Sequence, residues 1–250
     1  MARYQAILKY DGSEYSGMQR QAQVRTVQGV VEEALTKIGW GGDSILAAGR
    51  TDAGVHASGQ VISFDLEWRH PEADLLSALN ASLPEDAAVG SVTSVSEDFH
   101  PRYDAVSRRY RYSIFCQPER DPLRERYAWR IWPQVDVTKM RTAAQLLLGE
   151  HDYSAYGTPP KKDGHTIRQV MDANWRQSGD AFEFEIEANA FLYHMVRRIV
   201  SQQVEIGLSK HTPEIVVEYL DGQHSENVQG LAPPNGLNLT KVRYPSNGER

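Results

Sequence analysis

Apolar and polar residues alternate over Tyr4–Tyr10, which predicts a β-strand that ends in the turn-forming triplet at 11–13. Apolar residues then recur with a helical period over 27–38, where they form a single stripe. Thr26 has the side chain of an N-cap, and Gly39 is a suitable stop. The pattern therefore predicts a strand followed by an amphipathic helix.

The remaining periodic segments repeat this mixture of strands and helices. In the first half they predict strands at 44–48, 60–66 and 88–95, and a helix at 71–81. In the second half they predict strands at 109–116, 168–175, 182–188 and 237–244, and helices at 137–148 and 191–208, with a further helix opening at Thr212-Pro213. Two related α+β halves, 1–103 and 104–250, are the simplest interpretation.

The composition is that of a globular protein, with 40% hydrophobic and 24% charged residues in 250. No apolar run approaches the roughly 20 residues that span a bilayer, and the N-terminus has no signal-peptide pattern, so we expect a cytoplasmic protein. Cys116 is the single cysteine, and no pair has metal-ligand spacing. We therefore expect neither a metal nor a redox cofactor.

A net charge of −6 argues against indiscriminate binding of nucleic acid. Basic residues nevertheless cluster locally, which is compatible either with a positive cleft on an acidic body or with scattered solvated charges. The loop at 156–166 combines Gly and Pro with basic residues and is either a ligand-contacting arm or a plain exposed loop. The clusters are Arg108, Arg109 and Arg111; Lys161, Lys162, His165 and Arg168; and Arg197 and Arg198.

The segment 47–60, between two predicted strands, carries three glycines around Arg50 and Asp52. Such a sequence allows a tight backbone and close approach of a ligand. It lacks the pattern of a phosphate-binding P-loop and of a dinucleotide-binding turn. Taken alone, Asp52 fits a turn-forming residue better than a nucleophile.

The string Gly49–His56 resembles the motif of the TruA family of tRNA pseudouridine synthases. The resemblance continues in family order over nearly the whole chain. A match of this length changes the interpretation of Asp52. The further matching segments are 10–12, 19–21, 98–102, 108–112, 146–152, 188–197, 236–237 and 244–245.

The resemblance implies isomerisation of uridine to pseudouridine without a cofactor. The N1-glycosidic bond breaks, the base turns, and C5 bonds to C1′. In this family the matching Asp52 is the catalytic carboxylate, a role that suits a group able to form a covalent intermediate and leave again. Attack on the sugar and attack on the base both stay open.

An ionised Asp52 needs a cation if it is buried, because burial raises a carboxyl pKa and an adjacent arginine lowers it. The resemblance assigns this ion pair to Arg197. Periodicity alone cannot choose between Arg197 and Arg198, which flank opposite sides of the apolar stripe, and both could be solvated.

A stacked uridine must be flipped out before it reacts, at a cost of a few kcal/mol. The resemblance assigns Tyr110 to stacking on the base, worth roughly 1 to 3 kcal/mol, and to carrying the C5 proton. It assigns Arg50 to extruding the nucleotide and holding its backbone. Without the resemblance, Tyr110 is one of several strand aromatics.

Four further residues are expected at the substrate. Leu239 matches an apolar wall over the uracil, although a core role is equally plausible, and Arg20, Arg109 and His56 are expected to contact RNA. A purely structural role for His56 also stays open.

The full interpretation is an α+β fold of two pseudo-repeated ferredoxin-like (RRM-like) halves, with antiparallel sheets joined around a central cleft. The resemblance implies a homodimer that binds tRNA across both subunits and acts on uridines 38, 39 and 40 of the anticodon stem-loop. Two other hypotheses are an RNA chaperone without turnover and a nucleosidase. The second is disfavoured because such hydrolases usually pair two carboxylates, and Asp52 has no evident acidic partner in the sequence.

Overall fold

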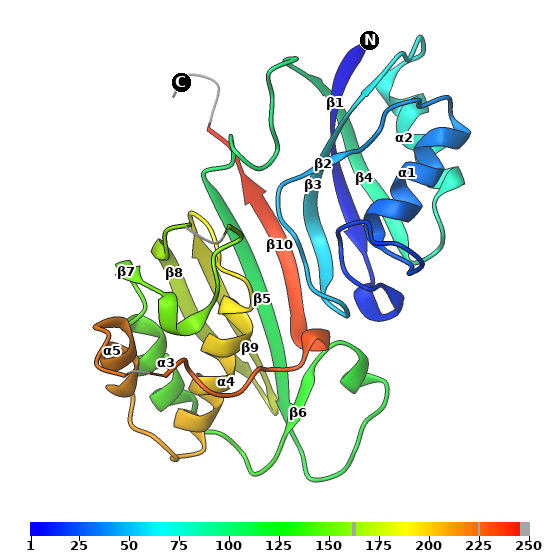
Figure 1. Cartoon of the computed structure of the whole chain (residues 1–250). Coiled ribbons are helices and arrows are strands. Elements are labelled where there is room, and N and C mark those ends of the chain that lie inside the picture. The colour runs from blue at the N-terminus through cyan, green and yellow to red at the C-terminus, as the bar shows by residue number, and fades with distance from the viewer. Residues whose placement is uncertain (162–163, 225, 246–250) are drawn as a thin grey trace. The chain divides into compact units, whose positions relative to one another are not determined.

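The computed structural model describes residues 1–161, 164–224 and 226–245, and the chain divides into two compact units (Figure 1). The first unit comprises Met1–Val106 and Asn238–Arg250, and the second comprises Ser107–Leu237. The predicted division at 103/104 lies just before this boundary. The prediction placed the last strand in the second half, whereas from Asn238 onward it packs with the first unit.

In the first unit, a sheet with the strand order β4-β1-β3-β10 carries two helices. β1 is antiparallel to both β3 and β4, β10 is parallel to β3, and the short β2 pairs with β3. The elements are β1 (Ala2–Tyr10), α1 (Val27–Lys37), β2 (Leu46–Ala47), β3 (His56–Leu66), α2 (Glu72–Ser82), β4 (Ala87–Val95) and β10 (Leu237–Arg243).

Local sequence explains the start of α1. The Thr26 Oγ1 accepts a hydrogen bond from the Gly29 N–H at 3.3 Å, as the N-cap prediction requires. Val27, Val31 and Leu35 then form the buried stripe. These contacts confirm the predicted helix.

In the second unit, a sheet has the strand order β5-β9-β8-β7, with all neighbours antiparallel, and β6 adds to β5 in parallel. α3 packs on β8 and on α4. The elements are β5 (Ser107–Cys116), β6 (Trp129–Ile131), α3 (Val137–Gln145), β7 (Gly149–Asp152), β8 (Ile167–Ser178), β9 (Ala181–Ala188), α4 (Met195–Gly207) and α5 (Ile215–Leu220), with short 3-10 turns at Gly12–Glu14, Arg124–Arg126, Ser154–Tyr156 and Pro234–Gly236.

Strand alternation gives this second sheet one apolar and one charged face. Tyr112 lies opposite Phe184, and Phe184 lies opposite Trp175, so large buried rings line up across three strands. Arg109 and Arg111 on β5 point to the other face. The apolar face forms the core of this unit.

Some predicted elements differ from those observed. The helix predicted over 191–208 begins at Met195, because His194 has a positive φ of 68° and interrupts the helix there. The strand predicted over 44–48 is reduced to Leu46–Ala47, and β6 and β7 are strands where none was predicted. The helix predicted to open at Thr212-Pro213 begins only at Ile215, with Glu214 rather than Thr212 at the N-cap position.

The α+β class is confirmed by these mostly antiparallel sheets and their packed helices. Among the described residues, no helix has the length and apolar character needed to cross a membrane.

Candidate active site

Asp52 lies in a tight turn between β2 and β3 of the first unit. The Val55 N–H donates to the Asp52 carbonyl at 3.2 Å, and Gly54 has a φ of +78°, as the third position of a type II turn requires. Asp52 is half-buried and Arg50 is exposed. The turn therefore holds a carboxylate and a guanidinium two residues apart.

The segment that follows β1 fixes the backbone of this turn. The Met18 N–H donates to the Thr51 carbonyl at 3.0 Å, and the Gly54 N–H donates to the Tyr15 carbonyl at 3.3 Å. Gly17 has a φ of +95°, and a Cβ there would lie 2.9 Å from the Thr51 carbonyl oxygen. Only glycine allows this close approach.

Two buried side chains fix the stem of the turn. Gln60 donates from Nε2 to the Gly49 carbonyl at 2.8 Å and accepts from the Gly49 N–H at 3.2 Å. The Tyr10 hydroxyl shares a 2.8 Å hydrogen bond with the Thr51 hydroxyl. Burial raises the pKa of Tyr10 to about 12, with hydrogen bonds to Thr51 and Gln60 acting in the opposite direction, so its phenol is neutral near pH 7.

A cluster around Asp86 anchors the Tyr15 segment. The Tyr15 hydroxyl donates to Asp86 Oδ1 at 2.6 Å, while Arg25 donates to both carboxylate oxygens at 2.7 and 2.9 Å. The Arg25 guanidinium also lies 4.2 Å from the Tyr15 ring centroid. Hydrogen bonding from Arg25 is the main cause that lowers the pKa of Asp86.

Three other predicted residues of the first unit make contacts within the folded chain. Arg20 donates to Glu32 at 2.7 Å, and the His56 Nδ1 accepts from the Gly12 N–H at 3.0 Å. Leu239 is fully buried and lies opposite Ala57 in the parallel register of β10 and β3. The burial of Leu239 fits a packed apolar position, and its substrate contact and those of Arg20 and His56 stay predictions.

Tyr110 lies in the second unit, on the apolar face of β5. Its side chain is buried opposite Ile186, and its ring makes an edge-to-face contact with Phe191 at 5.1 Å between centroids. Arg108, two residues earlier on the same face, donates to the Asn189 carbonyl at 2.9 Å. The backbone next to Phe191 is thus tied to the strand that carries Tyr110.

Arg109 points to the opposite face of β5. Its Nε and Nη2 donate to Glu187 Oε2 at 2.9 and 2.6 Å. The guanidinium also forms ion pairs, from Nη2 to Asp172 Oδ2 at 3.4 Å and from Nη1 to Glu185 Oε2 at 3.7 Å. Hydrogen bonding to Glu187 is the main cause that raises the pKa of Arg109. The structure therefore gives Arg109 a carboxylate cluster as its surroundings, and its predicted RNA contact stays a prediction.

Arg197 lies in the first turn of α4. Its Nε donates to the Ala232 carbonyl at 2.7 Å, and the Ala232 N–H donates back to the Arg197 carbonyl at 3.2 Å. Arg198, the alternative that periodicity left open, donates instead to the Tyr156 carbonyl at 3.3 Å. The strained φ of His194 just before α4 is the kind of backbone feature that often accompanies functional sites.

The predicted site residues thus fall in both units. Arg20, Arg50, Asp52, His56 and Leu239 belong to the first unit, and Arg109, Tyr110 and Arg197 to the second. Lys162, part of a predicted basic cluster, lies outside the described residues. Within the described ranges, no group of three or more His, Cys, Asp or Glu side chains could hold a metal ion.

Comparison with known proteins identifies the family of the chain. A family model described as tRNA pseudouridine synthase matches residues 6–104 and 143–245. The chain belongs to this tRNA pseudouridine synthase family.

Curated relatives agree over nearly their full length. A tRNA pseudouridine synthase A from Myxococcus xanthus is 40% identical over 98% of this chain and 92% of the relative. Proteins of the same name from Shewanella woodyi and a Thermotoga species are 40% and 38% identical, covering 95% and 98% of this chain and 91% and 100% of those relatives. The synthase described here is therefore an isomerase that converts uridine to pseudouridine in tRNA.

Sequence reasoning missed the residues that brace the Asp52 turn. Gln60 had a signal, since it is an amide in an otherwise apolar strand run. The Asp86 cluster had none, because Tyr15 and Arg25 lie 71 and 61 residues from Asp86 in sequence.

Proposed function

We propose that this synthase isomerises uridines 38, 39 and 40 in the anticodon stem-loop of tRNA, in the cytoplasm, with Asp52 as the nucleophile. The observation that carries the proposal is the braced turn around Asp52. A half-buried carboxylate on a backbone fixed by Gln60, Tyr10 and the Met18 segment is positioned before the substrate arrives. Such preorganisation lowers the entropic part of a reaction barrier.

The reaction is balanced without another reactant. Asp52 takes part in breaking the N1–C1′ bond, the uracil turns, and C5 bonds to C1′. The C5 hydrogen leaves as a proton, and N1 gains a proton, so substrate and product have the same composition. We assign Tyr110 to stacking on the flipped base and to the C5 proton transfer.

Two arginines complete the proposed catalytic set. We assign Arg197 to the ion pair that keeps Asp52 ionised, and its fixed Nε supports a defined position for the guanidinium. We assign Arg50 to the extruded nucleotide, which suits its exposure next to Asp52. The substrate contacts of Arg20, Arg109, His56 and Leu239, and the ferredoxin-like relation of the two units, belong to the same proposal.

The test is tritium release from tRNA transcripts labelled at uridine C5, followed by mapping of pseudouridine in the product. Release with pseudouridine at positions 38 to 40 supports the proposal. Pseudouridine elsewhere contradicts the regiospecificity, free uracil indicates a nucleosidase, and tight binding without release indicates a chaperone.

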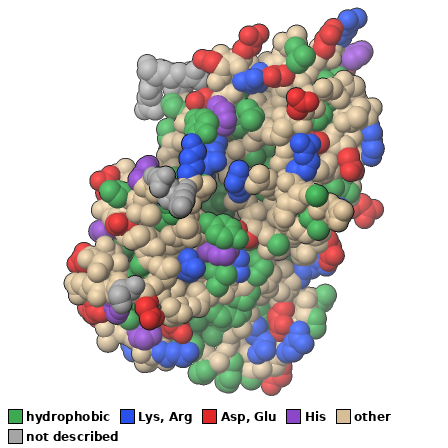
Figure 2. Space-filling view, viewed as in Figure 1, with side chains coloured by type: hydrophobic (Ala, Val, Ile, Leu, Met, Phe, Trp, Pro, Cys, Tyr) green, Lys and Arg blue, Asp and Glu red, His purple; other side chains and the backbone are tan. Residues whose placement is uncertain are grey.

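We further propose a homodimer, on the evidence of an exposed apolar surface in the second unit. Leu123, Tyr127 and Trp132 are 85%, 51% and 57% exposed, and Figure 2 shows hydrophobic side chains in the region around β6. Exposed apolar clusters of this kind are typical of protein interfaces.

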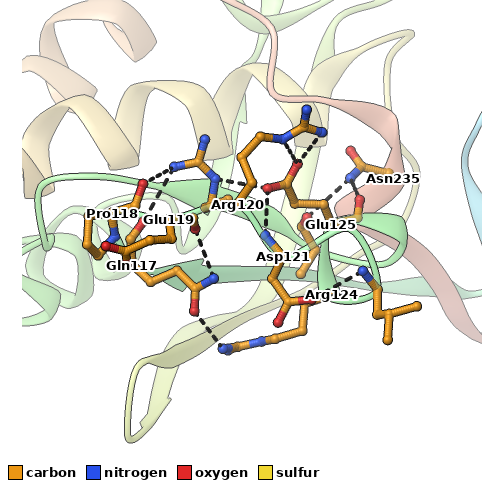
Figure 3. A network of polar contacts seen from close by, with 11 residues as sticks. Gln117, Pro118, Glu119, Arg120, Asp121, Arg124, Glu125 and Asn235 are labelled. Carbon is orange, nitrogen blue, oxygen red and sulfur yellow. Dashed lines mark hydrogen bonds and ion pairs between the residues drawn. The ribbon is translucent and has the colours of Figure 1, made fainter.

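The backbone that displays these side chains is held by a polar network (Figure 3). Glu125 accepts hydrogen bonds from Arg130 at 2.9 Å, from Arg120 at 3.2 Å and from the Asp121 N–H at 3.1 Å. Asn235 donates to the Ala128 carbonyl at 3.2 Å. A surface ordered in advance loses less entropy on binding a second copy of the chain.

Light scattering of a Leu123→Ser, Trp132→Ser double variant tests the dimer. We expect a folded monomer with weakened tRNA binding. A parent that already scatters light as a monomer would contradict the proposed dimer. A fully active monomeric variant would contradict tRNA binding across both subunits, and neither result bears on the reaction itself.

A further inference from the structure

The segment between β4 and β5 forms a compact turn over Asp98–Asp104 that displays an aromatic pair. Tyr103 is 73% exposed, and the centroid of its ring lies 4.2 Å from that of the His100 ring, at an interplanar angle of 39°. The Arg102 guanidinium lies 6.0 Å from the Tyr103 ring centroid. The exposed ring presents a flat aromatic face that is accessible to a stacking ligand.

Hydrogen bonds within the turn fix its shape. The Asp104 N–H donates to the His100 carbonyl at 3.1 Å, and Asp104 Oδ2 accepts from the His100 N–H at 2.9 Å. His100 Nδ1 accepts from the Arg102 N–H at 3.1 Å and the Tyr103 N–H at 3.4 Å. Because Nδ1 accepts, the proton of the neutral ring is on Nε2, which is then a donor.

The turn is also anchored to the rest of the first unit. The Phe99 ring packs 5.2 Å from the Tyr244 ring, and the Tyr244 hydroxyl donates to the Pro101 carbonyl at 2.8 Å. Arg3 donates to the Phe99 carbonyl at 3.2 Å. The aromatic pair is therefore presented on a rigid base.

Charges of both signs lie around the turn: Glu97 and Asp98 are exposed at its start, and cations lie beside its other end. The Val106 N–H donates to the Arg243 carbonyl at 2.8 Å, which places the end of β10 next to this segment, and Lys241 and Arg243 are both exposed on that strand. With Arg102, these residues combine cations and an aromatic platform in one region. That combination is suited to an unpaired nucleotide, whose base stacks and whose phosphate is anionic.

We propose that Tyr103, supported by His100 and Arg102, stacks on an unpaired base of the tRNA other than the uridine that reacts. The inference rests on the proposed function, because it names a second contact for the same substrate. RNA is favoured over a protein partner because the platform is a single exposed aromatic ring with Arg102, Lys241 and Arg243 in the same region. A protein interface would more typically have an apolar centre with few charges.

The test measures the affinity of the full-length enzyme for an end-labelled tRNA transcript by fluorescence anisotropy at several salt concentrations. We expect Tyr103→Leu to weaken binding about 10-fold, and Tyr103→Phe to recover most of that loss because the ring remains. The slope of log affinity against log salt should not change in Tyr103→Leu, whereas Arg102→Gln should reduce it by about one. Met171→Ala, which removes a 47% exposed side chain from β8, is the matched control and should bind like the parent.

Photo-crosslinking gives a readout that does not depend on any variant. A transcript containing 4-thiouridine should crosslink to the peptide that holds Tyr103. Parental affinity in Tyr103→Leu, or crosslinks that exclude this peptide, would overturn the inference. The proposed function would still stand in that case, provided that the parent enzyme releases tritium from labelled tRNA. An enzyme that neither binds tRNA nor releases tritium would overturn both.

Discussion

The side-chain amide of Gln60 forms hydrogen bonds to both the N–H and the carbonyl of Gly49, the residue three positions before Asp52. A fully buried glutamine thereby completes the backbone hydrogen bonding of a glycine that lies outside the strand. This contact links the sheet to the turn that presents the carboxylate.

Replacing Gln60 should therefore disturb both stability and turnover. We expect Gln60→Leu to lower the free energy of unfolding by about 2 kcal/mol, because it leaves the Gly49 groups without partners. We expect kcat to fall roughly 10- to 100-fold, since small displacements of a catalytic group are costly. Urea denaturation and steady-state tritium release measure the two effects. A variant with lower stability but parental kcat would show that Gln60 does not position Asp52.

Gly17 and Gly39 form a matched pair for testing the contact with the turn. Both have a positive φ, +95° and +96°, but a Cβ at Gly17 would lie 2.9 Å from the Thr51 carbonyl oxygen, while at Gly39 nothing lies within 4 Å. Gly39→Ala should cost about 1 kcal/mol of stability through backbone strain alone. Gly17→Ala should cost more and should also lower kcat, because Thr51 must shift. Equal effects in the two variants would contradict this account.

The Arg25–Asp86 pair predicts a pH-dependent contribution to stability. Because Arg25 lowers the pKa of Asp86 below its ordinary value of 3.8, the contribution is present above that pH and is lost as pH falls through the lower folded-state value. Because the Arg25 side chain is 40% exposed, solvent screening limits the contribution of this pair to the free energy of unfolding to about 1 kcal/mol. The difference in unfolding free energy between the parent and Asp86→Asn should be constant from pH 7 to about 5 and shrink below about 4. Glu33→Gln, at an exposed site on α1, is the control. If the difference in unfolding free energy between the parent and Asp86→Asn stayed constant down to about pH 3, the stabilising role of the Arg25–Asp86 pair would be refuted.

Arg109 can be tested for its two possible roles. Glu187 is only 2% exposed, and Arg109→Met removes the cation that lies 2.6 Å from its carboxylate. If the carboxylate cluster is its main partner, the variant should lose about 2 to 4 kcal/mol of stability. If Arg109 instead contacts RNA, the variant should keep its stability and show a reduced salt dependence of tRNA binding. Thermal unfolding and anisotropy titrations distinguish the two.

The elements that local patterns determine were predicted well. The Thr26 cap and the stripe of α1 are both confirmed, because capping and amphipathic burial depend on residues within a few positions of one another. The start of α4 was predicted too early, since nothing in the periodicity reveals the positive φ of His194. The pairing of β10 with β3 joins residues about 180 positions apart, and a periodic pattern carries no information on such partners.

The candidate site shows the same limit. Asp52 was identified from a motif, but its supporting residues were not, because Asp86 and Gln60 act through contacts that only the folded chain creates. For Arg109, alternation along β5 already implied a face opposite to that of Tyr110, yet the carboxylates around it come from two other strands.

The most direct test of the central claim is single-turnover tritium release by Asp52→Asn beside the parent. Asp74→Asn, at an exposed site on α2, serves as the matched control. We predict that Asp52→Asn binds tRNA with an affinity near that of the parent. Its rate of tritium release should fall by about 10⁴-fold or more, as expected when a nucleophile is removed. Release by Asp52→Asn at a rate near that of Asp74→Asn would contradict the assignment of Asp52 as the nucleophile.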